Sequence, residues 1–170
     1  FVVRCPRLFL RTILAYGLAI ATSLILFVAL PVTSIGLRPD GATLDVTRLS
    51  PWAVALLYRC DPPVNLFPSL HLSIATLAAM SAWKARRAYG FAALAGVLLI
   101  GASICTVKQH FVLDGLGGAA LAALIYAIVL RPYAPSAETD PAYGWRGPAA
   151  YAALLIGAYA GLYAGFRLRA

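Results

Sequence analysis

The chain is poor in charged residues. Only 12% of its 170 residues are charged, which is about half the fraction in a soluble globular domain. Hydrophobic residues make up 62% of the chain, and its mean hydropathy is strongly positive. This balance excludes an ordinary soluble domain and predicts an integral membrane protein.

Acidic residues and cysteines are scarce as well. The six Asp and Glu residues are scattered, without the cluster of oxygen ligands that Ca²⁺ or Mg²⁺ prefers. The three cysteines, Cys5, Cys60 and Cys105, match no metal or disulfide spacing. We interpret them as packing residues, with a Cys60–Cys105 bridge as the open alternative. No metal and no other cofactor is expected.

Five apolar stretches account for most of the sequence. They cover residues 12–32, 68–83, 88–107, 111–130 and 149–166, and about 20 apolar residues suffice to cross a bilayer as a helix. A further piece at 51–58 is amphipathic but too short to span. The predicted fold class is therefore all-α: a polytopic membrane helix bundle with about five transmembrane spans, forming a single membrane domain over residues 1–170.

Basic residues between the stretches predict the orientation. The net charge is +8, and the arginines form no stripe with interleaved aromatics, so we attribute the charge to topology and anionic lipid contact, not to nucleic acid. One side collects Arg4, Arg7, Arg11, Lys84, Arg86, Arg87, Arg131 and Arg146, the last in a polar loop at 132–148 that also holds Glu138 and Asp140. The positive-inside rule makes that side cytoplasmic. Both histidines then lie on the extracytoplasmic side, where the exceptions to the rule are Arg38, Arg48, Arg59, Arg167 and Arg169.

Only two histidines occur, and both lie where an apolar helix is expected to begin. His110 precedes Asp114 by four residues, so on a shared helical face the carboxylate can accept the ring N–H and fix the imidazole tautomer. A carboxylate inside a membrane is costly without such a partner. His71 follows Pro68 and Ser69 at the start of another helix. Two histidines on the side of the outward arginines indicate an anion site at the membrane surface.

Three short blocks resemble the type 2 phosphatidic acid phosphatase superfamily, whose pattern is Lys-x6-Arg-Pro, then Pro-Ser-Gly-His, then Ser-Arg-x5-His-x3-Asp. In the same order the chain carries Arg38-Pro39, Pro68-Ser69-Leu70-His71, and Ser103 with His110-x3-Asp114. The resemblance covers a catalytic core of about residues 31–120. Two spans before Phe1 would complete the six of the family core, and the span at 149–166 is an addition to it.

The chain also departs from this pattern. Pro31 replaces the lysine, Leu70 the glycine and Ile104 the arginine, while Lys108 is newly placed near the histidine. These departures are similar to the branch that contains inositol phosphorylceramide synthase. They favour transfer slightly over hydrolysis without deciding between the two.

The resemblance implies a membrane lipid-phosphate phosphatase or phosphotransferase. His110 would attack phosphorus to form a phosphohistidine, with Asp114 orienting its ring, and His71 would protonate the leaving oxygen. The phosphoryl group would be bound by Arg38, Lys108 and Ser69. The implied partners are a lipid phosphate at the extracytoplasmic face of the cell membrane and, for transfer, an acceptor alcohol.

Other interpretations of the same residues stay open. His110 and Asp114 can form a buried structural pair, Ser69 a helix cap, and Arg38 and Lys108 interfacial anchors. The glycines at 115, 117 and 118 favour close helix packing over a functional role. For the whole protein, the alternatives are a non-catalytic membrane subunit or binding module, and a haem protein with two axial histidines.

Overall fold

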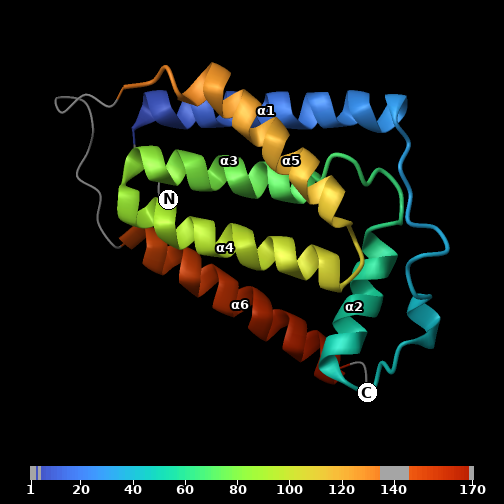
Figure 1. The fold of residues 1–170 in the computed structure, drawn as a ribbon. Coiled ribbons are helices and arrows are strands. Elements are labelled where there is room, and N and C mark those ends of the chain that lie inside the picture. Colours follow the sequence, from blue (N-terminus) through green and yellow to red (C-terminus); the bar gives the residue numbers. More distant parts are fainter. Residues whose placement is uncertain (1–2, 4, 135–145, 169–170) are drawn as a thin grey trace. The chain divides into compact units, whose positions relative to one another are not determined.

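The computed structural model describes residues 3, 5–134 and 146–168. Every regular element within these residues is helical (Figure 1), apart from one isolated β-bridge between Thr33 and Val64. The all-α prediction is therefore confirmed. The predicted features that lie outside the described residues are Arg4, Arg169 and the part of the polar loop with Glu138 and Asp140.

The described helices form two compact units. The histidine unit consists of residues 3–34 and 64–134, and the α2–α6 unit consists of residues 35–63 and 146–168. All three cysteines lie in described residues, and no disulfide joins them. Cys60 and Cys105 belong to different units, so the alternative bridge between them stays a prediction.

The histidine unit is built around one central helix. α3 (Leu70–Ala85) packs against α1 (Pro6–Ala29), α4 (Arg87–Thr106) and α5 (Val112–Ile125), and α5 continues as a π-helical turn, η2 (Tyr126–Leu130) (Figure 1). Apart from Leu8, the buried side chains of α1 are small. Ala15 and Ala19 are fully buried, and the Thr12 hydroxyl donates a hydrogen bond to the Ser81 hydroxyl of α3 at 3.1 Å. Such residues let helix backbones approach closely within a membrane.

Four helical segments in the described part of the chain are long and apolar enough to cross a membrane: α1, α4, α5 with η2, and 149–168 within α6 (Arg146–Leu168). α3 falls short of this length, since it has 16 residues and measures about 24 Å against about 30 Å of hydrocarbon. It begins at Leu70, after Ser69 as N-cap, so Pro68 precedes the helix instead of lying in its first turn. Because α3 is surrounded by three other helices, its length does not need to match the thickness of the hydrocarbon.

Polar contacts define the two ends of the histidine unit. At one end, Arg11 Nη1 donates to the Val129 carbonyl at 2.8 Å and Lys84 Nζ donates to the Tyr133 carbonyl at 2.9 Å. Cations near the last carbonyls of a helix are favourable. At the other end, where α3 and α5 begin, the Ser69 N–H donates to the Asp114 carbonyl at 2.9 Å. The basic residues Arg11 and Lys84 and the two histidines therefore lie at opposite ends of the helices of this unit.

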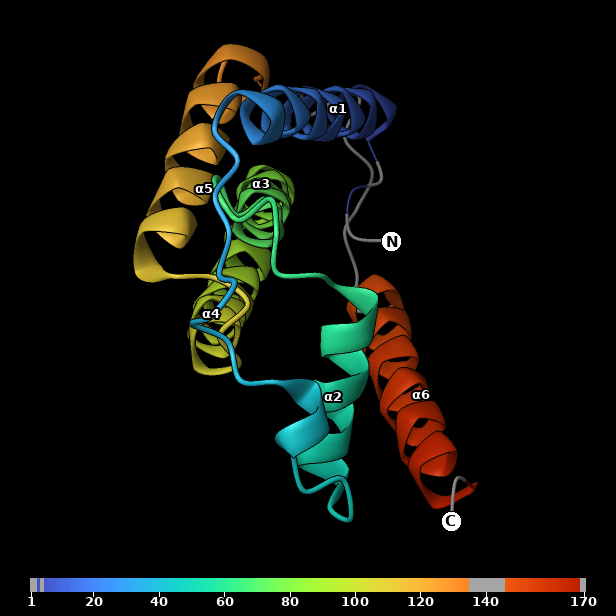
Figure 2. The same ribbon diagram turned by 90° about the vertical axis from the view of Figure 1, so that its right-hand side faces the viewer.

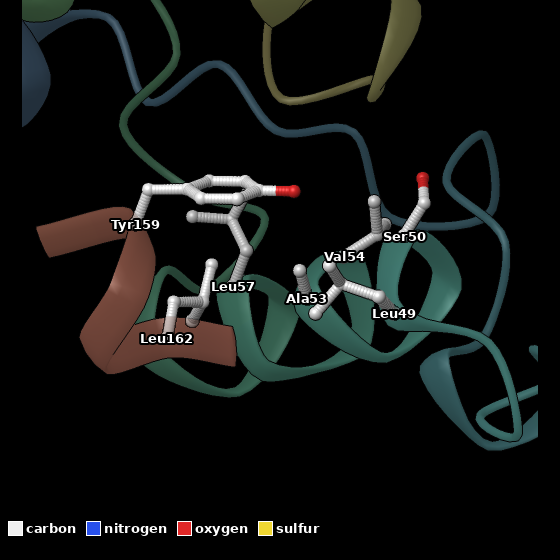
Figure 3. Close-up of a pocket in the computed structure, with 7 residues that line it drawn as sticks. All are labelled: Leu49, Ser50, Ala53, Val54, Leu57, Tyr159 and Leu162. Carbon is white, nitrogen blue, oxygen red and sulfur yellow. The ribbon is translucent and has the colours of Figure 1, made fainter. Parts of the chain in front are cut away.

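The α2–α6 unit pairs one short and one long helix. α2 (Leu49–Cys60) follows the 3₁₀ turn η1 (Gly41–Thr43) and runs beside α6 (Figure 2), with the Trp52 and Phe166 ring centroids 5.5 Å apart. Between the two helices is a hollow of about 390 Å³ (Figure 3), lined by Leu49, Ser50, Ala53, Val54, Leu57, Tyr159 and Leu162. None of these side chains is charged or an imidazole, so we assign no chemistry to the hollow.

Candidate active site

The end of α4 determines where His110 lies. The Ile104 carbonyl accepts the N–H groups of Gln109 at 2.9 Å and His110 at 3.1 Å, and the Cys105 carbonyl accepts that of Lys108 at 3.1 Å. This is the Schellman arrangement, in which the residue after the C-cap adopts a left-handed conformation. Here that residue is Lys108, with a φ of 52°. The tight turn brings His110 back over the end of α4 and buries it, with only 7% of its surface exposed.

Asp114 joins His110 to the start of α5. Its carboxylate accepts the N–H of the N-cap residue Phe111 at 2.8 Å, and the same oxygen, Oδ2, lies 3.8 Å from His110 Nδ1. The second distance is within the range of an ion pair but longer than a hydrogen bond. His110 is not part of α5, so the contact arises from the turn before the helix and not from a shared helical face. The carboxylate is also favoured here by the positive end of the α5 dipole.

His71 contacts His110 directly. It is the second residue of α3, whose N-cap is Ser69, and its side chain is exposed. His71 Nδ1 lies 3.3 Å from His110 Nε2, with the two rings 67° apart. The structure therefore brings together three of the predicted site residues, His71, His110 and Asp114, from the starts of two helices and the turn before one of them.

This geometry favours one set of proton positions. If the His110 Nδ1–H faces the Asp114 carboxylate, the Nε2 atom carries the lone pair and is a nucleophile. The hydrogen bond to that lone pair then requires a proton on His71 Nδ1, and His71 can act as an acid when its Nε2 carries a second proton. One nitrogen is thus ready to attack, and the nitrogen beside it is ready to give a proton. A separation of 3.3 Å leaves no space for a phosphoryl group or a haem iron between the rings, so a bound substrate requires the exposed His71 ring to turn aside.

The three predicted phosphate ligands have different surroundings. Lys108 is exposed in the turn before His110. Ser69 is fully buried, and its hydroxyl accepts the Leu72 N–H at 3.4 Å as a helix cap. Arg38 lies in the α2–α6 unit, where its guanidinium stacks 3.6 Å from the Tyr58 ring centroid and donates to the Asp61 carbonyl at 2.9 Å. Phosphate contact by these residues stays a prediction.

Two residues near the histidines have no place in the sequence prediction of the site. Ser73 is fully buried, and its hydroxyl lies within hydrogen-bond distance of the Ser69 and Gly118 carbonyls. The sequence signal was the Ser-x3-Ser spacing of Ser69 and Ser73, which places both on one helical face. Gly118 was interpreted as a packing glycine, and close packing is confirmed, since a Cβ there would lie 2.4 Å from the Ser69 carbonyl oxygen.

Within the described residues, no group of three or more His, Cys, Asp or Glu side chains is arranged to hold a metal ion.

A family model described as the PAP2 superfamily matches residues 1–128. The chain belongs to the PAP2 superfamily. Membership indicates a membrane phosphatase-type enzyme, and the match includes both histidines and Asp114. No curated protein and no solved structure gives a significant match to the chain. The assignment to the inositol phosphorylceramide synthase branch stays a prediction.

One departure from the PAP2 pattern has a structural counterpart. Ile104, which stands where the pattern has arginine, is buried at 4% exposure, while its carbonyl holds the turn that carries His110. An arginine head group at this position would have to leave the protein interior to reach a phosphate. The exposed Lys108 in the next turn offers a cation instead.

Proposed function

We propose that this PAP2 protein is a membrane lipid-phosphate phosphatase or phosphotransferase that works through a phosphohistidine intermediate at the extracytoplasmic face. The observation that carries the proposal is the 3.3 Å contact between His71 Nδ1 and His110 Nε2, with the Asp114 carboxylate on the other nitrogen of His110. A nucleophile, a proton donor and an orienting carboxylate are thus adjacent in the order that covalent catalysis requires.

In the first half-reaction, the bond from His110 Nε2 to phosphorus forms and the bond from phosphorus to the lipid oxygen breaks. His71, protonated on both ring nitrogens, gives one proton to that oxygen and becomes neutral, so that the lipid leaves as an alcohol. The phosphorylated His110 ring keeps its Nδ1 proton and becomes cationic. The Asp114 carboxylate, 3.8 Å away, stabilises this charge without taking the proton.

In the second half-reaction, the neutral His71 takes a proton from water or from an acceptor alcohol. The resulting oxygen nucleophile attacks phosphorus, and the bond to His110 Nε2 breaks. Hydrolysis and transfer therefore use the same residues and differ only in which hydroxyl compound enters. We propose transfer to an alcohol as the second activity, because Leu70 and Ile104 are among the departures that resemble the inositol phosphorylceramide synthase branch.

Charge stabilisation comes from cations and helix N–H groups in this proposal. Lys108 is exposed beside His110, and Arg38 supplies the second cation as the family pattern implies. The free N–H groups at the start of α3 point toward the same end and favour an anion. The buried Ser69 hydroxyl caps this helix by accepting the Leu72 N–H, and its contact with phosphate stays a prediction.

The proposed orientation follows from the charges of the histidine unit. Its basic residues Arg7, Arg11, Lys84 and Arg87 lie at the end opposite to the histidines, and basic residues favour the cytoplasmic side. The histidines would then meet the head groups of the outer leaflet. A lipid phosphate lies at this level of the bilayer with its acyl chains still among the exposed apolar helix faces.

Phosphate release from purified protein in detergent tests the proposal. A panel of lipid phosphates is offered with and without an acceptor alcohol, and with and without a chelator, beside the His110→Ala variant. We expect chelator-resistant phosphate release, a phosphorylated alcohol when transfer occurs, and neither product from His110→Ala. No phosphate release from the wild-type protein would instead favour the non-catalytic membrane subunit. Normal turnover by His110→Ala, or turnover that disappears in chelator and returns with Mg²⁺, would contradict the mechanism.

A further inference from the structure

Ser73 connects the two helices that carry the site. It lies one helical turn after Ser69, inside α3, and none of its surface is exposed. Its hydroxyl oxygen is 2.9 Å from the Ser69 carbonyl oxygen and 3.1 Å from the Gly118 carbonyl oxygen of α5. A serine hydroxyl has one proton, so this proton is shared between an acceptor in its own helix and an acceptor in the neighbouring helix.

Gly118 lets the same two helices touch at this level. A Cβ built there would lie 2.4 Å from the Ser69 carbonyl oxygen and 3.1 Å from the Ser73 hydroxyl. The first distance is to rigid backbone, so any side chain would force α5 away from α3. A third contact lies one turn nearer the histidines, where the Ser69 N–H donates to the Asp114 carbonyl at 2.9 Å.

These contacts hold the backbone on both sides of the histidine pair. Ser69 precedes His71 by two residues, and Asp114 carries the carboxylate beside His110. A displacement of α3 relative to α5 at Ser73 and Gly118 therefore changes the distance from His71 Nδ1 to His110 Nε2. Proton transfer depends on hydrogen-bond reach, and a misplacement of about 1 Å can lower a rate by about 100-fold.

We propose that Ser73 and Gly118 are positioning residues that set the register of His71 against His110 and the reacting phosphate, a role that rests on the proposed function. Neither residue touches the reacting atoms. Each acts through the backbone, Ser73 by its hydrogen bond between helices and Gly118 by its lack of a side chain.

The chain offers a matched control on the same helix. Ser81 is also a buried serine of α3, and its hydroxyl lies 2.8 Å from the Leu77 carbonyl one turn before it, but it is near the opposite end of the helix. Ser73→Ala and Ser81→Ala thus remove the same group from similar surroundings. Only the first removes a contact beside the histidines.

The experiment compares kcat and KM for a lipid phosphate and for an aryl phosphate, whose leaving group needs little protonation. We expect Ser73→Ala to lower kcat on the lipid phosphate by about 10-fold or more with KM nearly unchanged, and to lower kcat on the aryl phosphate much less. Gly118→Ala should show the same dependence on the leaving group. Ser81→Ala should change kcat on the two substrates little and equally. Ser73→Cys, which keeps the size and a weak donor, should fall between wild type and Ser73→Ala.

The outcomes separate this role from the proposed function. If His71→Ala shows the dependence on leaving group but Ser73→Ala, Ser73→Cys and Gly118→Ala do not, the positioning role is wrong and the catalytic proposal stands. Equal losses for Ser73→Ala and Ser81→Ala on both substrates would mean that the hydroxyl serves helix packing alone. If His110→Ala keeps normal turnover, both proposals are overturned together.

Discussion

The two histidines differ in access, and the difference matches their proposed roles. His110 is 7% exposed, whereas His71 is exposed at the start of α3. We expect His110→Ala to abolish turnover and any trapped phosphoenzyme on every substrate. His71→Ala should be much slower on a lipid phosphate, since general acid help contributes about 10²–10⁴-fold, and far less impaired on an aryl phosphate. Rate constants for both substrates and phosphoenzyme trapping by acid quench measure this.

Asp114→Asn gives an intermediate case. The amide keeps the size of the side chain, and its oxygen can still accept the Phe111 N–H, but the amide does not stabilise a cationic His110. We expect a loss smaller than that of His110→Ala and similar on both substrates. Identical losses for the two histidine variants on both substrates would show that the division of roles is wrong.

Lys108 occupies a backbone conformation that favours glycine. Its φ of 52° lies in the left-handed region, which costs a residue with a side chain about 1 kcal/mol relative to glycine. We therefore expect that the lysine side chain has a role other than stability. Lys108→Gly should therefore raise the midpoint of thermal unfolding while lowering kcat/KM for lipid phosphates.

Lys108→Gln is the control for the backbone effect. It removes the same positive charge but keeps the unfavourable left-handed conformation, so we expect the same loss of kcat/KM with no gain in thermal stability. A Lys108→Gly variant that is more stable and fully active would show that the lysine serves only as an interfacial anchor.

At the scale of elements, helix boundaries were predictable wherever the sequence gives a local signal. α4 was expected at 88–107 and is found at Arg87–Thr106, and α5 was expected from about Phe111 and begins at Val112. Basic residues and the polar turn at 108–110 mark these boundaries. The apolar composition of α3 predicted a fifth span. The helix has only 16 residues and is surrounded by other helices, and composition alone does not distinguish contact with helices from contact with lipid.

The candidate site was predictable in its residue types but not in its contacts. The spacing of His110 and Asp114 indicated their proximity, although by a shared helical face that the structure does not have. The direct contact between His71 and His110 depends on how α3 and α5 pack, which joins residues 39 positions apart. The role of Ser73 was not predictable, because the Ser-x3-Ser spacing does not reveal that its hydroxyl faces the Gly118 carbonyl of the neighbouring helix.

Lys84 stabilises the end of the α5–η2 segment. Its ammonium group donates to the Tyr133 carbonyl at 2.9 Å and lies 3.3 Å from the Arg131 carbonyl oxygen. Lys84→Met keeps much of the apolar stem and removes these bonds. We expect it to lower the free energy of unfolding by about 1–2 kcal/mol without changing the ratio of activities on lipid and aryl phosphates.

Arg87→Met is the matched control for Lys84→Met. Arg87 is exposed at the start of α4, near the same end of the histidine unit, so the variant removes a similar charge without those carbonyl contacts. Thermal unfolding in detergent compares the two variants. An equal loss of stability for both would mean that the general charge of this end matters and that the contacts of Lys84 do not.

At the scale of the whole molecule, the family match and the compact units divide the chain differently. The PAP2 match ends at residue 128, so it includes α2 and excludes α6, although α2 and α6 pack together in one unit. The sequence anticipated α6 as an addition to the family core. That it provides a partner for α2, through Trp52 and Phe166, is a tertiary contact without a sequence signal.

The opposite ends of α4 give a direct test of the proposed orientation. Ala88 lies at the basic end and Thr106 at the histidine end, and both are exposed. Single cysteines are introduced as Ala88→Cys and Thr106→Cys in a background without Cys60 and Cys105, while Cys5 stays because it is buried. Neither substitution changes the charges that set the orientation.

If the histidines face the extracytoplasmic side, a membrane-impermeant thiol reagent added to intact cells should label Thr106→Cys and leave Ala88→Cys unlabelled. Ala88→Cys should become reactive only after the membrane is permeabilised, and the parent without added cysteines should stay unlabelled in both cases. The reverse pattern would place the histidines on the cytoplasmic side. The contact between His71 and His110 would then serve lipid phosphates of the inner leaflet, because the chemistry of the pair does not depend on the face that it meets.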